Sequence, residues 1–164
     1  MSHQSVVQLI QDTAQSLADN IQFGYGRRSD FNIIQSKSFP YIWLAPLTAS
    51  ISYTVNNTIN YQKTWNCSVL FFELDREDSI ETEYKPILDT LDTLVDKFLN
   101  RLNDWSLTEQ DNVGAITIRN ITQNPFFKTD SDVLTGWVIT FQLITPDDFL
   151  YCTPDNIAIY AGTV

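Results

Sequence analysis

Residues 59–74 read INYQKTWNCSVLFFEL, and this stretch decides how the rest of the chain can fold. Its first half alternates polar and apolar side chains, whereas residues 69–72 are all apolar. Alternation with a period of two is typical of a half-buried strand, and a continuous apolar run is typical of a strand covered on both faces. We therefore predict one long strand over 59–74, exposed near its beginning and buried near its end.

The residues before this strand predict its hairpin partner. Residues 49–55 alternate apolar side chains with serine and threonine, which indicates a second strand. Asn56-Asn57 is typical of a tight turn between the two strands, because asparagine tolerates a positive φ. A shorter apolar strand is expected over 39–45, with a proline near each end that favours an edge or a strand end.

Two amphipathic helices are expected, over 5–23 and 83–103. In the first, apolar side chains recur at three- and four-residue steps after Ser5, which is a suitable N-cap. Gly24 and Gly26 are expected to end this helix, since glycine readily adopts the left-handed turn that closes one. In the second, apolar side chains lie on one arc at about 100° per residue.

Two more strands, over 114–121 and 134–145, complete the expected fold, with a polar loop over 122–133 between them. The tail, 146–164, is expected to be irregular but ordered because it carries several large apolar residues. Consecutive strands favour antiparallel pairing. The sequence therefore predicts a single domain, 1–164, of the α+β class: an antiparallel sheet of about five strands with a long hairpin and two helices packed on one face.

Composition excludes several classes of function. The chain has 164 residues, a formal net charge of -10 and only ten lysines and arginines, so it lacks the basic excess that binds nucleic-acid phosphates. No apolar run reaches the roughly 18 residues of a membrane span, and the beginning of the chain does not resemble a signal peptide. We expect a protein made in a cytoplasm, without sequence-specific nucleic-acid binding or membrane partners.

The residues that usually carry catalysis are scarce. The only histidine, His3, lies where chains usually fray, which argues against zinc sites and against serine or cysteine catalysis through histidine. Cys67 and Cys152 are far apart and are expected to be two buried thiols, with a disulfide or a reactive thiol as the alternative. No phosphate-binding or nucleophile motif is present. We expect no enzymatic activity, no cofactor and no metal site.

Acidic residues gather where the long strand ends and the second helix begins. Residues 73–111 contain twelve acidic and four basic residues, a net charge of -8. Such carboxylates could bind a hard cation, but acids near the beginning of a helix also complement its dipole while they remain solvated. We favour the second interpretation.

Aromatic residues are more numerous than one small core needs, with Trp43 and Trp137 already expected inside. Some of the others are candidates for subunit contacts, because aromatic residues concentrate in interface cores. Burial in the subunit's own core is the alternative. The candidates are Tyr61, Trp65, Trp105, Phe126, Phe127, Phe149 and Tyr160.

The layout resembles the tail-terminator and neck (head-to-tail connector) ring proteins of tailed bacteriophages. The matching features follow the N-terminal helix in the order FPYIWL at 39–44, WNCSVLFFELD at 65–75, the acidic helix ending in KFL at 97–99, and LTGWVITFQL at 134–143 followed by PDD at 146–148. This is a match of pattern over most of the chain, without a diagnostic motif.

The resemblance implies a non-enzymatic virion protein of the tail or neck, assembled in the host cytoplasm. Its partners would be five or eleven further copies of itself in a six- or twelve-fold ring, and the neighbouring tail-tube or connector proteins. Such a ring leaves a channel for DNA, and a like-charged wall would let DNA pass. Asp89, Asp92 and Asp96 are therefore candidates for facing the channel, with a solvated outer face as the alternative.

Two other functions remain open from the sequence. One is an acidic cytosolic adaptor, monomeric or dimeric, that holds a peptide through an aromatic patch. The other is a metal-dependent hydrolase that uses Glu73, Asp75 and Asp78, against which the lack of glycine-rich loops counts.

Overall fold

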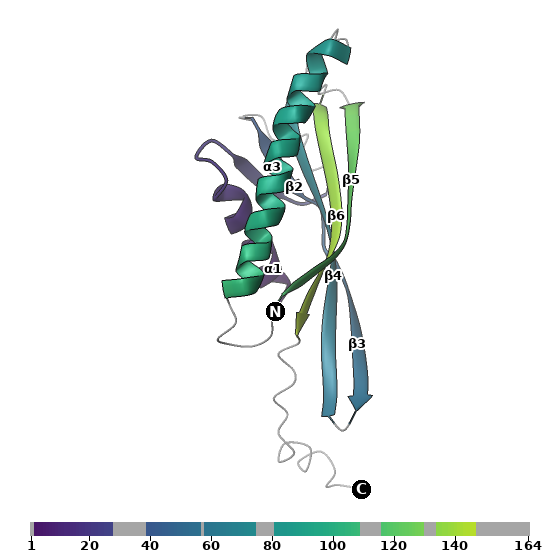
Figure 1. The fold of residues 1–164 in the computed structure, drawn as a ribbon. Coiled ribbons are helices and arrows are strands. Elements are labelled where there is room, and N and C mark those ends of the chain that lie inside the picture. Colours follow the sequence, from purple (N-terminus) through teal and green to yellow (C-terminus); the bar gives the residue numbers. More distant parts are fainter. Residues whose placement is uncertain are drawn as a thin grey trace, which may run out of the picture.

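The computed structural model describes residues 2–27, 39–56, 58–74, 81–108, 116–129 and 134–146. Within these residues the chain forms one sheet, with helices α1 (His3–Gln15) and α3 (Glu81–Thr108) on the same side of it (Figure 1). The strands are β1 (Gln22–Tyr25), β2 (Tyr41–Leu44), β3 (Thr48–Asn56), β4 (Thr58–Leu74), β5 (Thr117–Thr129) and β6 (Leu134–Pro146).

The predicted α+β class is confirmed, as are the long hairpin and the packing of both helices on one face. The sheet has the order β1-β2-β4-β6-β5, and β3 pairs with another stretch of β4. It contains six strands rather than about five, and it is mixed rather than wholly antiparallel, because β1 pairs in parallel with β2.

Strands β2 and β3 form one interrupted strand along the same edge of β4. Leu44 pairs with Val69 and Thr48 pairs with Asn66, so residues 45–47 oppose only two residues of β4. One extra residue on one strand is a β-bulge, and Pro46 lies within it, where proline is tolerated. The buried end of β4 thus pairs with β2, and its outer end pairs with β3.

The main core lies between the sheet and the two helices. Alternate residues of β4 face the helices, among them Trp65, Val69 and Phe71, each at most 3% exposed. Phe98 of α3 is fully buried, and its ring meets that of Phe71 edge to face with centroids 5.4 Å apart. This period-two burial is what the sequence of 59–74 predicts.

A second apolar cluster lies on the other side of the sheet, because its residues alternate with those of the main core. It contains Tyr41, Trp43, Phe72 and Leu134, all buried. Tyr41 and Phe72 stack with centroids 5.6 Å apart, and the indole of Trp43 donates a hydrogen bond to the carbonyl of Gly26. The apolar run at 69–72 is therefore covered on both faces, as expected.

The first helix is shorter than predicted. It begins at His3 with Ser2 as its N-cap rather than Ser5, and it ends at Gln15 rather than near residue 23. Ile21 is buried and continues the three- and four-residue spacing of the apolar residues of α1, but it lies in a turn after the helix. The residues that follow, Gln22–Tyr25, form β1, which the apparent continuation of the helix concealed.

The predicted loop over 122–133 is wrong as far as Thr129, because β5 continues to that residue. Polar residues and Pro125 suggested a loop. An edge strand tolerates polar residues and proline, since its outer edge faces solvent and makes no backbone hydrogen bonds to a neighbouring strand. Two shifts of register interrupt the pairing of β5 with β6, one of them at Asn120, which has a positive φ of 54°.

The remaining boundaries are close to the prediction. Helix α3 begins two residues earlier and ends five residues later than the predicted 83–103. Of the tail over 146–164, only the backbone of Pro146 lies within the described residues. Neither helix in the described part of the chain is both long enough and apolar enough to cross a membrane.

Candidate functional site

The face of the sheet opposite the helices carries, beside the second apolar cluster, a polar ladder of hydrogen-bonded side chains. We use this name for the side chains of Thr48, Asn66, Gln142 and Asn120, one from each of β3, β4, β6 and β5. Asn66 donates to the hydroxyl of Thr48 (3.3 Å) and accepts from the amide of Gln142 (3.2 Å). Gln142 in turn accepts from Asn120 (2.6 Å), so one chain of hydrogen bonds crosses four strands.

Strand alternation and one bulge build this ladder. Asn66 lies between the core residues Trp65 and Cys67, and Gln142 lies between Phe141 and Leu143, so both point away from the helices. Asn120 reaches Gln142 because it adopts a positive φ where β5 shifts its register. The ladder consists of amides and a hydroxyl, and its members satisfy one another without charge.

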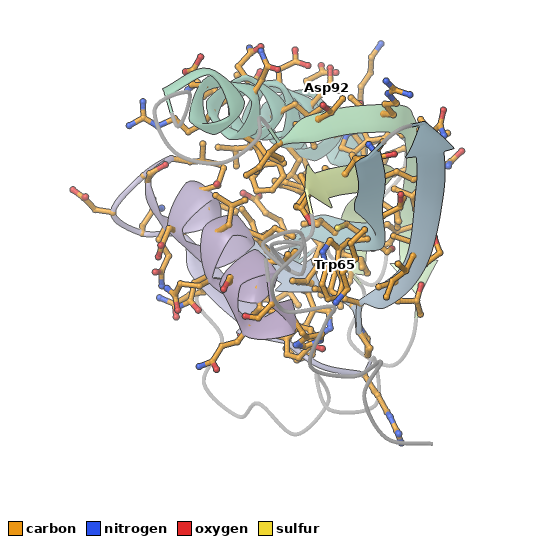
Figure 2. All side chains as sticks on the ribbon, turned by 90° about the horizontal axis from the view of Figure 1, so that it is seen from below. Trp65 and Asp92 are labelled. Carbon is orange, nitrogen blue, oxygen red and sulfur yellow. The ribbon has the colours of Figure 1, made fainter. Side chains whose placement is uncertain are left out.

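Trp65, a predicted interface residue, is instead a core residue. It is only 3% exposed and lies between α1 and the sheet, with the ring of His3 5.9 Å away and the ammonium of Lys63 4.4 Å from its centroid (Figure 2). The indole nitrogen is buried and has no hydrogen-bond partner among the described residues. His3 also contacts the hydroxyl of Tyr25 at 3.0 Å, so the expectation that His3 frays is wrong.

Two of the other aromatic candidates lie on β5. Phe126 is half-buried and packs on the second apolar cluster, 6.5 Å from Phe72. Phe127 is 44% exposed, and its ring lies 5.0 Å from that of Tyr84 on α3. The side chains of Tyr61 and Trp105, and all of Phe149 and Tyr160, lie outside the described residues. Of the predicted interface residues whose side chains are described, only Phe127 is exposed, and it lies beside Tyr84. This pair is less than the patch that a peptide adaptor would use.

The three predicted channel residues are exposed on α3. Asp92 accepts a hydrogen bond from the amide of Gln123, which ties the helix to β5, and it lies at the periphery in Figure 2. Across the described side chains of α3, four carboxylates accompany three cations, Lys85, Lys97 and Arg101. These described side chains are nearly balanced in charge, so most of the acidity of 73–111 comes from other residues of that stretch, among them Glu81 and Glu83 at the beginning of the helix.

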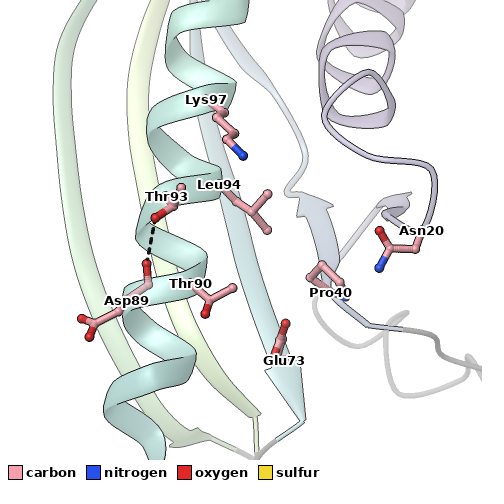
Figure 3. Close-up of a pocket in the computed structure, with 8 residues that line it drawn as sticks. All are labelled: Asn20, Pro40, Glu73, Asp89, Thr90, Thr93, Leu94 and Lys97. Atoms are coloured by element: carbon pink, nitrogen blue, oxygen red, sulfur yellow. Dashed lines mark hydrogen bonds between the residues drawn. The ribbon is translucent and has the colours of Figure 1, made fainter.

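A shallow groove of about 540 Å³ separates α3 from the C-terminal end of β4, from Pro40 and from the loop after α1 (Figure 3). Its polar lining includes Glu73, Asp89 and Lys97. The hydroxyls of Thr90 and Thr93 also line it, and each donates to a backbone carbonyl four residues earlier in the helix. Neither hydroxyl is paired with a base as a nucleophile requires.

Metal binding has little support from the described side chains. Among them, no three histidine, cysteine, aspartate or glutamate residues gather in a way that could hold an ion. Glu73 is the only member of the acidic cluster at 73–83 whose side chain is described; Asp75, Glu77 and Asp78 lie outside the described residues.

Glu73 is half-buried in the groove, and the loss of solvent around its carboxyl raises the pKa of this group above its usual value. Between the usual pKa and the raised one, the folded protein holds a proton that the unfolded chain releases. Raising the pH through that window therefore lowers the free energy of unfolding, and the loss persists at higher pH.

We expect Glu73→Gln to melt at a higher temperature than the unmodified protein at pH 7, with the gain shrinking towards pH 4. Thermal melts across this pH range test the expectation. Asp89→Asn is the matched control, because it removes one negative charge from the same groove. An equal, equally pH-dependent gain in Asp89→Asn would attribute the effect to net charge rather than to the burial of Glu73.

Cys67 is a buried free thiol on the helix side of β4. Burial raises the pKa of this thiol to about 12, so almost no reactive thiolate exists at neutral pH. This agrees with the predicted core role. Cys152 lies outside the described residues.

The sequence matches no model of a known protein family, and no curated protein matches it.

Proposed function

We propose that the protein is a structural subunit of a phage virion that forms a ring at the end of the tail tube or in the neck. The ring joins the tail to the head connector and leaves a channel for DNA. The proposal combines the resemblance of the sequence to tail-terminator and neck proteins with the two-layer architecture, in which the helices cover one face of the sheet.

The observation that carries the proposal is the polar ladder on the other face. Its amides and hydroxyl bond to one another across four strands, and Thr122 and Thr140 extend this pattern through a hydroxyl pair. A DNA channel needs a wetted wall that does not hold phosphates, because each lysine or arginine contact strengthens binding. In the described sheet Arg119, opposite Gln142, is the one charged residue paired directly opposite a ladder residue, so the proposed wall carries this cation beside its uncharged amides.

The ladder is a better candidate for the channel wall than Asp89, Asp92 and Asp96. Those three carboxylates share the helix surface with nearby cations, and Asp92 is engaged by Gln123. We therefore place α3 on the outside of the ring and the open face of the sheet towards the channel.

The native mass of the purified protein, measured by light scattering over a wide concentration range, tests the proposal. We expect a closed species of six or twelve subunits of 18.8 kDa, with a central hole in electron micrographs of the same sample. Reconstruction of the ring then tells which face lines the hole. A protein that stays monomeric, and that also fails to bind the ends of isolated tail tubes, would contradict the proposal.

A further inference from the structure

The two long edge strands of the sheet differ in how they resist pairing with another chain. The edge strand β5 contains Arg119, Pro125 and Lys128, and its register shifts twice. Charges, proline and bulges are the devices by which natural edges avoid unwanted strand pairing. By contrast, β3 contains no charged residue, proline or glycine, and it pairs with β4 without interruption from Thr48 to Asn56.

The outer edge of β3 is also well delimited and pairs with no other described strand. Within the described residues β4 is its only partner, and the hairpin that the two strands form extends beyond the rest of the sheet (Figure 1). The bulge at residues 45–47 bounds β3 at one end, and the connection to β4 bounds it at the other. The result is a nine-residue edge with Ser52 at its midpoint.

The sequence of this edge is complementary to itself. In an antiparallel pair centred on Ser52, Ile51 lies opposite Tyr53 of the partner subunit, and Ser50 lies opposite Thr54 of the partner subunit. The outer pairs also match, alanine with valine and threonine with asparagine. Apolar and β-branched cross-strand pairs and hydroxyl pairs stabilise a sheet, and this register uses all nine residues. Ile51 is 59% exposed in the single chain and gains an apolar neighbour in the pair.

We propose that β3 is a docking edge for a second copy of this chain, which adds its own β3 in antiparallel orientation with Ser52 opposite Ser52 of the partner subunit. The contact has two-fold symmetry and uses the same surface on both copies. It goes beyond the proposed ring, whose subunits contact one another head to tail. Two copies can pair through β3 alone, or subunits of two stacked rings can do so.

A single cysteine tests the register. Antiparallel partners directly opposite each other have Cα atoms about 4.5–5.5 Å apart, within the range that a disulfide spans. We expect Ser52→Cys, made together with Cys152→Ser, to form a disulfide-linked dimer under mild oxidation. Cys67 can stay in place because it is buried and unreactive at neutral pH.

Ser50→Cys in the same background is the matched control. It also lies exposed on β3 and on the same face, but in the proposed register the two copies of residue 50 are offset by four residues, roughly 14 Å along the strand. We expect its dimer yield on non-reducing gels to be at least tenfold lower. Equal yields from the two variants would overturn the proposed pairing.

A pair of lysine substitutions tests which edge is used, without relying on a disulfide. Ile51→Lys on β3 is expected to abolish the two-fold contact, measured as a loss of dimer mass. The new charge lies opposite Lys63 of β4 within the hairpin, so a small fall in melting temperature is also expected, and circular dichroism checks that the subunit stays folded. Ile121→Lys on β5 introduces the same charge at a comparably exposed position, 48%, and is expected to leave the dimer intact. The reverse result would assign the contact to β5 and overturn the proposal.

These outcomes are distinguishable from those of the ring experiment. If the protein forms a six- or twelve-subunit species but Ser52→Cys gives no cross-linked dimer, the ring is supported and the β3 contact is contradicted. If Ser52→Cys gives a cross-linked dimer but no larger species forms, the β3 contact is supported and the ring is contradicted.

Discussion

Replacing Gly136 with alanine is expected to destabilise the protein by more than about 3 kcal/mol, near the upper limit for overpacking a core. Gly136 lies on β6 directly opposite Phe72 of β4. An added Cβ would overlap the carbonyl oxygen of Phe71 and lie 2.8 Å from the Cα of Phe72. Both neighbours belong to the backbone of the central strand, so the clash is relieved only by separating β4 from β6.

Urea unfolding followed by tryptophan fluorescence measures this loss. Thr140→Ala, at an exposed position of the same strand, is the control and is expected to change stability by less than about 1 kcal/mol. Gly24→Ala is a useful intermediate case, because its added Cβ would meet the ring of Trp43 at 2.5 Å, and a side chain can shift more easily than a backbone. If Gly136→Ala unfolds at the same urea concentration as Thr140→Ala, the close approach of β4 and β6 is wrong.

The second large effect is expected from Phe98→Ala, which should cost about 3–5 kcal/mol. Phe98 is fully buried and joins α3 to two strands, through Phe71 on β4 and through Phe141 on β6, whose ring centroid is 6.5 Å away. Truncation therefore leaves a cavity at the centre of the helix–sheet interface, and the neighbours that line it lie on different elements that cannot easily collapse into it.

Phe127→Ala provides the same chemical change at a 44% exposed position and is expected to cost less than about 1 kcal/mol. Denaturant unfolding of both variants gives the comparison directly. A cycle that adds Phe71→Ala should show coupling between residues 71 and 98, since their rings are in contact. Equal losses in Phe98→Ala and Phe127→Ala would contradict the assignment of Phe98 to the core.

The elements predicted well are those whose burial follows one simple period. The strand 59–74 and the helix 83–103 were each predicted from the spacing of apolar residues, and burial of Trp65, Val69, Phe71 and Phe98 follows that spacing. The prediction was wrong at Ile21, which has the spacing of a helical core residue but lies in a turn. It was also wrong around Pro125, where the sequence of the edge strand β5 is typical of a loop.

The candidate site was less predictable because it depends on register. Alternation alone places Asn66 and Gln142 on the solvent side of their strands, and this could have been noticed. That they lie opposite each other, and that Asn120 joins them from a bulge, depends on pairing between residues more than twenty positions apart. The aromatic candidates show the converse problem, because composition reveals an excess of aromatic residues but not that a second cluster buries Tyr41, Trp43 and Phe72.

The single 17-residue strand β4 also has a consequence for how this protein can change over generations. Its end near Phe71 and Phe72 is locked between two apolar clusters, where almost any substitution endangers folding. Its beginning, paired with β3, lies beyond the end of β6, whose last pairing is between Pro146 and Gln62. Substitutions there change the surface of the hairpin without affecting the core, so the proposed contact through β3 can change while the fold is kept. One continuous strand thus joins a part of the molecule under strict selection to a part in which new specificities can arise.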